Sequence, residues 1–406
     1  MRHAIPLLFL LAATTAHAQW TQVGGYAFAK PGTTVGSAGD VRLEGGTFRN
    51  RGRVFCQTLQ TDSASTLRGT GIWNIRENLI ALGNVLETST FAMIGDSASL
   101  IHANTLHRLW LDKNTGPGAV VNLTAPLVLA NQLRFVQAGN KLQLNGHDLT
   151  LQASSTIAGA DNTNFVVTND GGRLLRQNLG ASNFRFPVGA DVDTYNPLQI
   201  SNLGTPDDIA VRCLPDALQG GSTGAPFASD AVAAAWQVTE AVPGGSDCTL
   251  RASWYLPDEL PNFNRRSCAL RQHDGTVWQP APLGTSTGAG PYTRVRAGLT
   301  ELGYFAVLDA SVPFAATDDR SASAPLQVQV WPNPATDVAR LQISGGSDTE
   351  SIDIQLFDEQ GHLLAQEKLA ASPAAFPMPV GDLPPGTYFV EVRDGQARAM
   401  GRFVKM

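Results

Sequence analysis

The first part of the chain is a succession of short runs in which apolar and polar residues alternate. These runs recur about every eight to ten residues, and the clearest are Leu109–Leu111, Val120–Leu123, Leu127–Leu129, Leu133–Phe135 and Leu142–Leu151. Such short strands favour a solenoid, in which each turn stacks its few inward apolar residues on the turn before it. We therefore predict a right-handed parallel β-helix over residues 19–170. Because the Asn145-Gly146 pair is also a hairpin signal, an antiparallel β-sandwich is the alternative.

Residues 171–310 contain longer strand-like runs, with apolar residues at every second position. They include Phe184–Gly189, Tyr195–Ile200, Ile209–Cys213, Ala235–Thr239, Thr249–Tyr255 and Tyr304–Leu308. Period-two runs separated by turn residues predict a β-sandwich. We expect Trp236, Trp254 and Trp278 to fill its core. The alternative places these tryptophans in a sugar-stacking cleft.

A stretch that contains Ser, Ala and Asp, residues 311–325, predicts an exposed linker. Beyond it, residues 326–406 alternate again, at Leu326–Trp331, Leu341–Ile343, Ile352–Asp358 and Tyr388–Val392. This pattern predicts a second, small β-sandwich. The chain is therefore predicted to be all-β, with a parallel β-helix-like solenoid followed by two antiparallel domains.

The composition agrees with a folded, exported β-protein. Of the 406 residues, 43% are hydrophobic and 16% are charged, and the formal net charge is −6. The apolar fraction is high enough to bury a core, which argues against disorder. The charged fraction is below the usual ~25%, so uncharged polar residues must cover much of the surface. A negative net charge supplies no basic field for nucleic acid.

The N-terminus has the pattern of a secretory signal peptide. Arg2 and His3 give a positive end, Ile5–Ala13 is an apolar run, and Ala16-His17-Ala18 is a small-x-small cleavage site. We predict that residues 1–18 are removed. The apolar run is shorter than the about 20 residues that a membrane span needs, and no later run reaches that length. We expect no transmembrane segment.

The four cysteines fit an oxidising compartment. They are Cys56, Cys213, Cys248 and Cys268, an even number whose spacing has no Cys-x-x-Cys pair and so disfavours zinc. Cys248 and Cys268 are the best candidate disulfide, and Cys56 would then pair with Cys213. Four cysteines allow three connectivities, and free buried thiols are the alternative.

Candidate residues for catalysis or metal binding are few. Gly95–Leu100 contains a Gly-Asp-Ser sequence, but a nucleophilic serine needs a base and an oxyanion hole, and we expect a turn here. The acidic Asp191–Asn196 stretch lacks the Gly and Glu of an EF-hand loop. Carboxylates are scattered singly, whereas glycoside hydrolysis needs a facing pair. We predict no catalytic residue, no cofactor and no metal.

Four motifs follow the predicted linker in a fixed order. They are Trp331–Asp337 (WPNPATD), Ile354–Gly361 (IQLFDEQG), Leu383–Val392 (LPPGTYFVEV) and Arg402–Lys405 (RFVK). Together they resemble the type A C-terminal sorting domain of the type IX secretion system. The final Met406 departs from the basic end of that family's pattern. The resemblance covers about a fifth of the chain.

This resemblance implies a fold, a partner and a set of motif residues. The fold would be a small immunoglobulin-like β-sandwich over residues 326–406, and the partner would be the outer-membrane translocon of the type IX system. Cargo of this kind is commonly cut near the linker, here between residues 315 and 325, and is then released or joined to surface polysaccharide. The implied sorting-signal residues are Pro332, Asn333, Pro334, Asp337, Gly361, Gly386, Tyr388 and Lys405.

The upstream part also resembles β-solenoid cargo of Gram-negative surface proteins, in the Leu142–Leu151 run and in Phe186–Gly189 with Tyr195–Leu198. We therefore predict a secreted or cell-surface structural or adhesive protein, not an enzyme, with surface glycan as a candidate partner. One alternative is a polysaccharide lyase or hydrolase with acids gathered on one solenoid face. The other is a carbohydrate-binding module, for which Trp110 is the best candidate in the first part.

Overall fold

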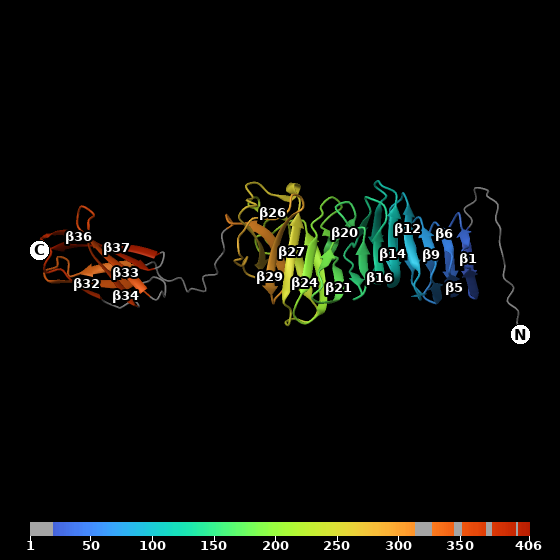
Figure 1. Ribbon diagram of the computed structural model, residues 1–406, viewed down its shortest axis with the longest axis horizontal. Helices are drawn as coiled ribbons and strands as arrows, with labels where there is room; N and C mark the ends of the chain where they lie inside the picture. The colour runs from blue at the N-terminus through green and yellow to red at the C-terminus, as the bar shows by residue number, and fades with distance from the viewer. Residues whose placement is uncertain (1–18, 313–326, 345–350, 371–375, 395–396) are drawn as a thin grey trace. The chain divides into compact units, whose positions relative to one another are not determined.

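A computed structural model describes residues 19–312, 327–344, 351–370, 376–394 and 397–406. The predicted signal peptide, residues 1–18, and all but the first two residues of the predicted linker lie outside the described residues. The chain separates into two compact units, Met1–Ala315 and Ala316–Met406. Each unit is built from strands, and each is described by itself (Figure 1).

The first unit begins as a parallel β-solenoid of about 8 turns. Its strands return in sequence to three sheets, so that successive turns stack one behind another (Figure 1). The first sheet has the order β1(Trp20–Val23), β4(Val41–Glu44), β7(Leu59–Thr61), β10(Leu79–Ala81), β13(Ser99–Ala103), β15(Val120–Leu123), β17(Lys141–Gln143), β20(Phe165–Val167), β23(Val188–Gly189). The second has the order β11(Asn84–Val85), β8(Ser65–Gly69), β5(Gly46–Asn50), β2(Tyr26–Ala29). The predicted parallel solenoid is confirmed, and the antiparallel alternative for this part is wrong.

The third sheet runs through the whole unit. Its parallel part has the strand order β3(Thr34–Gly36), β6(Arg53–Cys56), β9(Ile72–Ile75), β12(Thr90–Gly95), β14(Thr105–Lys113), β16(Leu127–Phe135), β18(Leu149–Leu151), β21(Leu174–Leu179). A further short strand, β19(Thr156–Ala158), also pairs with β16. From β21 it continues with antiparallel strands, in the order β25(Asp207–Leu214), β26(Ala231–Glu240), β30(Tyr304–Asp309), β28(Cys268–His273). Solenoid and antiparallel part therefore share one sheet and one core.

Pairing in register from turn to turn explains the stacking. The inward positions of the third sheet pair in register from Val54 to Trp73, Phe91 and Leu109, and all four side chains are buried. The rings of Trp73 and Phe91 stack with centroids 6.5 Å apart and planes at 6°. Burying a large apolar side chain contributes about 1.5–3 kcal/mol, so this column accounts for much of the stability of the early turns.

Parallel pairing extends past residue 170, where we placed the end of the solenoid. Leu149–Leu151 pairs with Leu174–Arg176, and Val166 pairs with Val188. Beyond these strands the pairing is antiparallel. A smaller sheet has the order β22(Phe184–Phe186), β24(Leu198–Asn202), β27(Cys248–Trp254), β29(Tyr292–Leu299). Two short 3-10 helices, η1(Asn169–Gly171) and η2(Leu256–Asp258), interrupt the strands.

The three tryptophans of the antiparallel part are buried, as predicted. Trp236 and Trp254 are fully buried and Trp278 is 4% exposed. Each indole Nε1 donates a hydrogen bond, to Asn196 O (2.8 Å), Glu259 Oε1 (2.9 Å) and Leu218 O (3.0 Å) respectively. Because the rings are enclosed and their N–H groups are satisfied, they are core residues and not a sugar-stacking cleft.

The candidate Cys248–Cys268 disulfide is not formed. All four cysteines are free, buried thiols. Cys248 lies on β27 in the smaller sheet, whereas Cys268 lies on β28 in the third sheet, and the Cys268 thiol donates to Arg265 O (3.5 Å). Burial raises the pKa of each to about 11, so both remain protonated at neutral pH. The two cysteines are close in the sequence, but their strands belong to different sheets.

The second unit consists of two antiparallel sheets around one core. One has the order β31(Gln327–Trp331), β32(Val338–Ser344), β35(Phe376–Pro379), and the other β34(Leu363–Ala370), β33(Ser351–Phe357), β36(Gly386–Asp394), β37(Ala397–Lys405). Inward side chains from both sheets form one cluster, Ala335, Ala339, Leu341, Ile343, Ile352, Ile354, Leu356, Met378, Val380, Tyr388, Val390, Val392 and Phe403. The described residues include no helix long and apolar enough to cross a membrane.

Candidate functional site in the C-terminal unit

The opening motif of the second unit is bonded to the last strand of the chain. The Asn333 side chain accepts a hydrogen bond from Val404 N (2.9 Å) and donates one to Arg402 O (3.3 Å). Two residues later, Ala335 N donates to Val404 O (2.8 Å) and Met406 N donates to Ala335 O (3.0 Å). Pro332 and Pro334 flank Asn333 and hold the backbone φ of this segment near −65°. The first and last motifs are therefore one structural element.

Tyr388 joins the third motif to the same strand. Its ring stacks on Phe403 with centroids 5.5 Å apart, and its hydroxyl donates to Pro384 O (2.7 Å). Gly386 pairs with Lys405 where β36 begins. The φ of Gly386 is not in the left-handed region, and an added Cβ would make only ordinary contacts at 3.8 Å or more. The backbone therefore does not require glycine here.

The last strand ends on a buried lysine. Lys405 is 8% exposed, its Nζ donates to Met406 O, and its backbone bridges to Ala335. Burying a lysine costs free energy unless its ammonium is hydrogen-bonded. The basic residue of the fourth motif thus belongs to the junction between the first motif and the last strand.

Gly361 and Asp337 lie away from this junction. Gly361 has φ +85° in the turn between β33 and β34, where Asp358 Oδ1 accepts from Gln360 N (2.9 Å) and His362 N (2.8 Å). A positive φ favours glycine. The backbone carbonyl of Asp337 accepts from Val380 N (2.9 Å). The motif residues thus fall into a group at the last strand and two separate turn positions.

Sequence reasoning missed one ionic group in this unit. The Glu391 side chain is 3% exposed and pairs with Arg393 Nε (2.6 Å) and Arg398 Nε (2.6 Å). The hydrogen bond from Arg393, with the charges of both guanidinium groups, lowers the pKa of the Glu391 carboxyl. Glu391 and Arg393 are two residues apart and therefore share one face of β36, and Arg398 lies opposite Arg393 on β37. The Glu-x-Arg spacing is the signal that the sequence offers for this group.

Side chains of the first unit that could take part in chemistry do not gather into one site. Ser97 lies in an exposed turn between β12 and β13. His102 contacts Thr124, and His273 is buried against Trp278. Asp191 accepts from Asp193 N and Thr194 N, both at 2.8 Å, as in an ordinary turn. Among the described residues, no group of three or more His, Cys, Asp or Glu could hold a metal ion.

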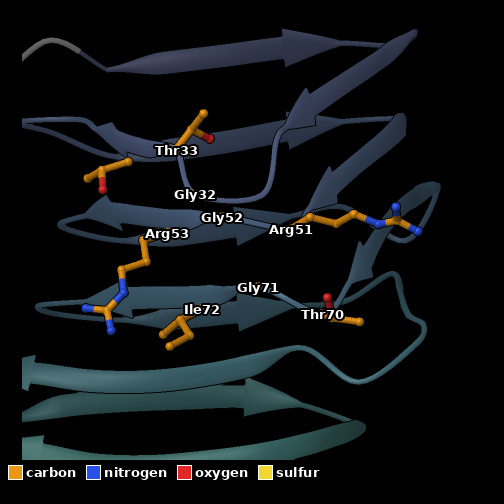
Figure 2. Close-up of a pocket in the computed structure, with 9 residues that line it drawn as sticks. Gly32, Thr33, Arg51, Gly52, Arg53, Thr70, Gly71 and Ile72 are labelled. Atoms are coloured by element: carbon orange, nitrogen blue, oxygen red, sulfur yellow. The ribbon is translucent and has the colours of Figure 1, made fainter.

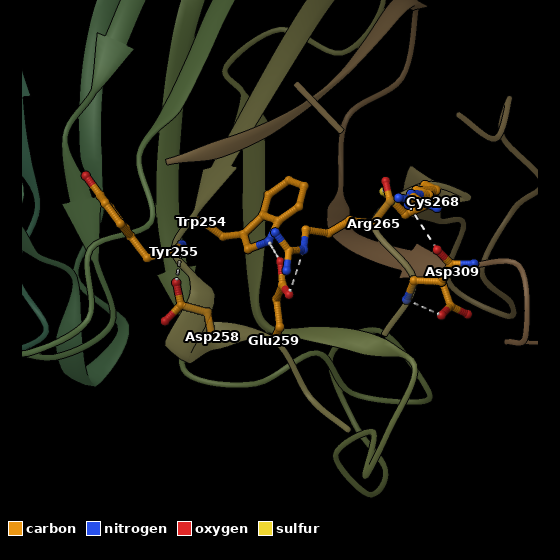
Figure 3. A network of polar contacts seen from close by, with 9 residues as sticks. Trp254, Tyr255, Asp258, Glu259, Arg265, Cys268 and Asp309 are labelled. Atoms are coloured by element: carbon orange, nitrogen blue, oxygen red, sulfur yellow. Dashed lines mark hydrogen bonds and ion pairs between the residues drawn. The ribbon is translucent and has the colours of Figure 1, made fainter. Parts of the chain in front are cut away.

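Two consecutive carboxylates, Asp258 and Glu259, follow β27, but they face different partners (Figure 3). Asp258 Oδ2 accepts from Tyr255 N and Asn196 Nδ2, both at 2.8 Å, and burial raises the pKa of this carboxyl. Glu259 accepts from Trp254 Nε1 and pairs with Arg265 Nε at 3.1 Å. These bonds fix the loop after β27 and hold the two carboxylates on separate partners.

Two surface features of the solenoid remain. A shallow pocket at the turns before β3, β6 and β9 is lined by Thr33, Arg51, Arg53, Thr70 and the backbone of Gly52 and Gly71 (Figure 2). On β14, Trp110 is half-buried, its Nε1 donates to Gln132 Oε1 (3.3 Å) and the Arg134 guanidinium lies 5.2 Å above its ring. The Arg134 guanidinium therefore covers one face of the Trp110 ring.

The comparison with protein families identifies the second unit. Residues 329–406 match the model of the secretion system C-terminal sorting domain. This range includes all four sequence motifs. A search of curated proteins gave no match to the chain.

Proposed function

We propose that this type IX secretion cargo, which carries its sorting domain at residues 329–406, is a structural or adhesive protein of the cell surface. The sorting domain accounts for secretion or surface delivery by the type IX machinery. We further propose that residues 1–18 direct the preceding export step and are removed. The finer question is what residues 19–312 do after delivery.

The observation that carries an adhesive role is the regular outer surface of the solenoid. Outward side chains of the third sheet pair in register from turn to turn, for example Arg53 with Ile72 and Arg108 with Gln132. Adjacent strands lie about 4.8 Å apart, so the sheet offers a flat surface with a short repeat. Such a surface suits an extended polymer better than a small substrate.

We propose binding and not catalysis as the role of this unit. Asp258 and Glu259, which are neighbours in the sequence, are each held by hydrogen bonds within their own loop. A glycosidase needs two carboxyl groups on either side of one bond, about 5–9.5 Å apart. The alternative is an enzyme that cleaves polysaccharide, and the following experiment must distinguish cleavage from adhesion.

The test exposes the mature chain, starting at Gln19, to immobilised glycans, matrix proteins and whole bacterial cells. We expect retention on at least one of these surfaces, and intact polymer after incubation. New reducing or unsaturated chain ends would instead show an enzyme. Absence of retention on every surface would overturn the adhesive role and leave only delivery by the sorting domain.

A further inference from the structure

The outer face of the third sheet has two parallel rows of outward residues. One row pairs Arg53, Ile72, Thr90, Arg108 and Gln132, and the neighbouring row pairs Phe55, Asn74, Ala92, Trp110 and Arg134. Thr90, Asn74 and Ala92 are buried, and the other members are exposed or half-buried. On each strand, the residue that lies between the two rows points into the core. Examples are Val54, Leu109 and Leu133. We call the surface formed by Arg53, Arg108, Trp110, Gln132 and Arg134 the arginine face.

The charges on this face differ from those of the whole chain. The outward positions of β6, β9, β12, β14 and β16 in these rows carry Arg53, Arg108 and Arg134 and no acid. Asp112 lies outside the rows, two residues beyond Trp110 on β14. The chain as a whole has a formal net charge of −6. These rows are therefore positively charged in a chain whose net charge is negative.

The described ion pairs of the first unit use other arginines, namely Arg49, Arg68, Arg173 and Arg265. On the arginine face, the side chains Arg53 and Arg134 are exposed. Figure 2 shows the Arg53 side chain next to Ile72, its neighbour in the row. These two guanidinium groups are accessible to a ligand in solution.

Two of the arginines are held in place by neighbouring groups. Arg108 Nε donates to Asn131 Oδ1 (3.0 Å) and its Nη1 donates to Thr88 O (3.1 Å). Arg134 stacks on the Trp110 ring, which is itself fixed by the bond to Gln132. A side chain that is already ordered loses less conformational entropy on binding. The face is therefore preorganised for an anion.

We propose that the arginine face binds an acidic polysaccharide, one that carries carboxylate groups along an extended chain. This inference rests on the adhesive function proposed above and specifies its ligand. A guanidinium group binds a carboxylate through two parallel hydrogen bonds. Arg53 and Arg108 are separated by three strand spacings, or about 14 Å, and Arg108 and Arg134 lie on neighbouring strands.

The spacing favours a polysaccharide over nucleic acid. Duplex DNA carries one charge about every 1.7 Å, far denser than three arginines spread over five strands. The acidic remainder of the protein would also repel such a dense polyanion. A polymer with one carboxylate per sugar or fewer matches the arginines without bringing excess charge close to the rest of the surface.

The experiment measures binding of the full mature chain to polygalacturonate and to its fully methyl-esterified form, at two salt concentrations. We expect binding to polygalacturonate only. The double variant R53Q/R134Q should bind about tenfold more weakly, because two charge-assisted hydrogen-bonded contacts are lost, and its salt dependence should fall by roughly one ion per arginine removed. The control R251Q/R266Q removes two exposed arginines elsewhere and should bind like the unmodified chain.

Three results would overturn the proposal. They are equal binding to the esterified polymer, equal loss in the control variant, and tighter binding to duplex DNA than to polygalacturonate. If the chain still adheres to cells in these cases, the adhesive function stands and the assignment to this face fails. If the chain adheres to nothing, both fail. Far-ultraviolet circular dichroism is recorded for all variants. If the spectra match that of the unmodified chain, a loss of binding is due to the arginine face and not to misfolding.

Discussion

Single polar side chains stabilise both units at points where the backbone would otherwise be left unpaired. Asn333 supplies an acceptor and a donor to the last strand. Lys113 is fully buried in the solenoid, and its Nζ donates to Arg76 O (3.0 Å), Ile94 O (2.9 Å) and Ser99 Oγ (2.7 Å). In each case one residue satisfies groups that belong to separate segments, so its removal has a measurable cost.

Substitution of Asn333 by Ala should weaken the sorting domain. Two hydrogen bonds between the opening motif and the last strand are lost, which we expect to cost about 1 kcal/mol and to lower the melting temperature of this unit by about 4–8 °C. Calorimetry of the full chain would measure this shift, and the secreted fraction should fall with it. The control Q360A changes a side chain in the β33–β34 turn, where only the backbone N–H of Gln360 bonds to Asp358. An unchanged melting temperature in N333A would contradict the role of this junction.

Lys113 should make the stability of the solenoid depend on alkaline pH. Burial lowers the pKa of its ammonium group from 10.5 to about 8. Between these values the unfolded chain binds the proton and the folded chain does not, so the free energy of unfolding rises with pH in this window. Denaturant unfolding at pH 7.5, 9 and 10.5 would reveal the rise as ~1 kcal/mol or more.

The matched variant is K113M, which cannot titrate. It should be less stable than the unmodified chain at every pH, by roughly 2–3 kcal/mol, because the two carbonyl groups lose their donor. Its stability should also lack the additional rise above pH 8. The same pH dependence in both proteins would show that another group is responsible.

At the level of residues, the sequence identified positions better than it identified their roles. Tyr388 and Asn333 were found through the motifs, and both make specific contacts. Gly386 was found in the same way, yet its position at the start of β36 does not require a glycine. Lys113 was not found, because a charged residue at an inward position looks like a break in the apolar pattern until its partners from other strands are known. Glu391 was not found, because it lies between the core residues Val390 and Val392, at a polar position of a regular alternation.

At the level of elements, the close approach of successive turns limits side-chain size at their corners. Gly118 precedes β15, and a Cβ added to it would lie 1.6 Å from Asp96 O in the turn before. Real contacts of this kind do not occur, so the backbone of one turn would have to move away from the next. The solenoid therefore needs glycine at this corner because of space, not because of φ.

Substitution of Gly118 by Ala should destabilise the solenoid by about 2–4 kcal/mol, as expected for overpacking against backbone. The control G36A introduces the same methyl group on β3, where nothing lies within 4 Å of an added Cβ. It should be neutral or more stable by about 0.4–1 kcal/mol, since it restricts the unfolded chain. Urea unfolding followed by tryptophan fluorescence compares the two. Equal effects would mean that the turns can separate at little cost.

The two-residue alternation predicted that these elements are strands, but it did not predict which strands pair with each other. The short runs of the first part correctly indicated stacked parallel turns, because strands of three or four residues bury enough surface only against identical neighbours. The longer runs correctly indicated antiparallel strands. The change between them was placed at residue 170, whereas Val188 still pairs in parallel with Val166. Both kinds of strand alternate with the same period, so the pattern cannot report the direction of the neighbour.

The same limit explains the cysteines. Cys248 and Cys268 both lie in alternating runs and both are buried, which made a disulfide plausible. Their strands join different sheets, and strand order across a sheet depends on contacts far apart in the sequence. Sequence spacing alone therefore could not decide which strands, and which thiols, become neighbours.

At the level of the whole molecule, the division into two compact units separates delivery from the role of the passenger. Each unit has a hydrophobic cluster formed from its own residues, and the cluster of the second unit draws only on residues from Ala335 to Phe403. A stop codon after residue 325 should therefore leave the first unit folded but remove the part that the type IX machinery reads. We expect the truncated protein to remain inside the outer membrane, with protease resistance and circular dichroism of the solenoid retained.

Transfer of residues 326–406 to an unrelated exported protein provides the converse experiment. Because the last strand is held by the opening motif through Asn333 and Ala335, the fusion must include both ends of this segment, and a fusion that lacks residues 332–337 should be exported poorly. Surface labelling of the carrier with the complete segment, and not with the shortened one, is the expected result. If the truncated native chain still reached the surface, the address would have to lie in the solenoid, and the close bonding of the first and last motifs would then serve only the stability of the C-terminal unit.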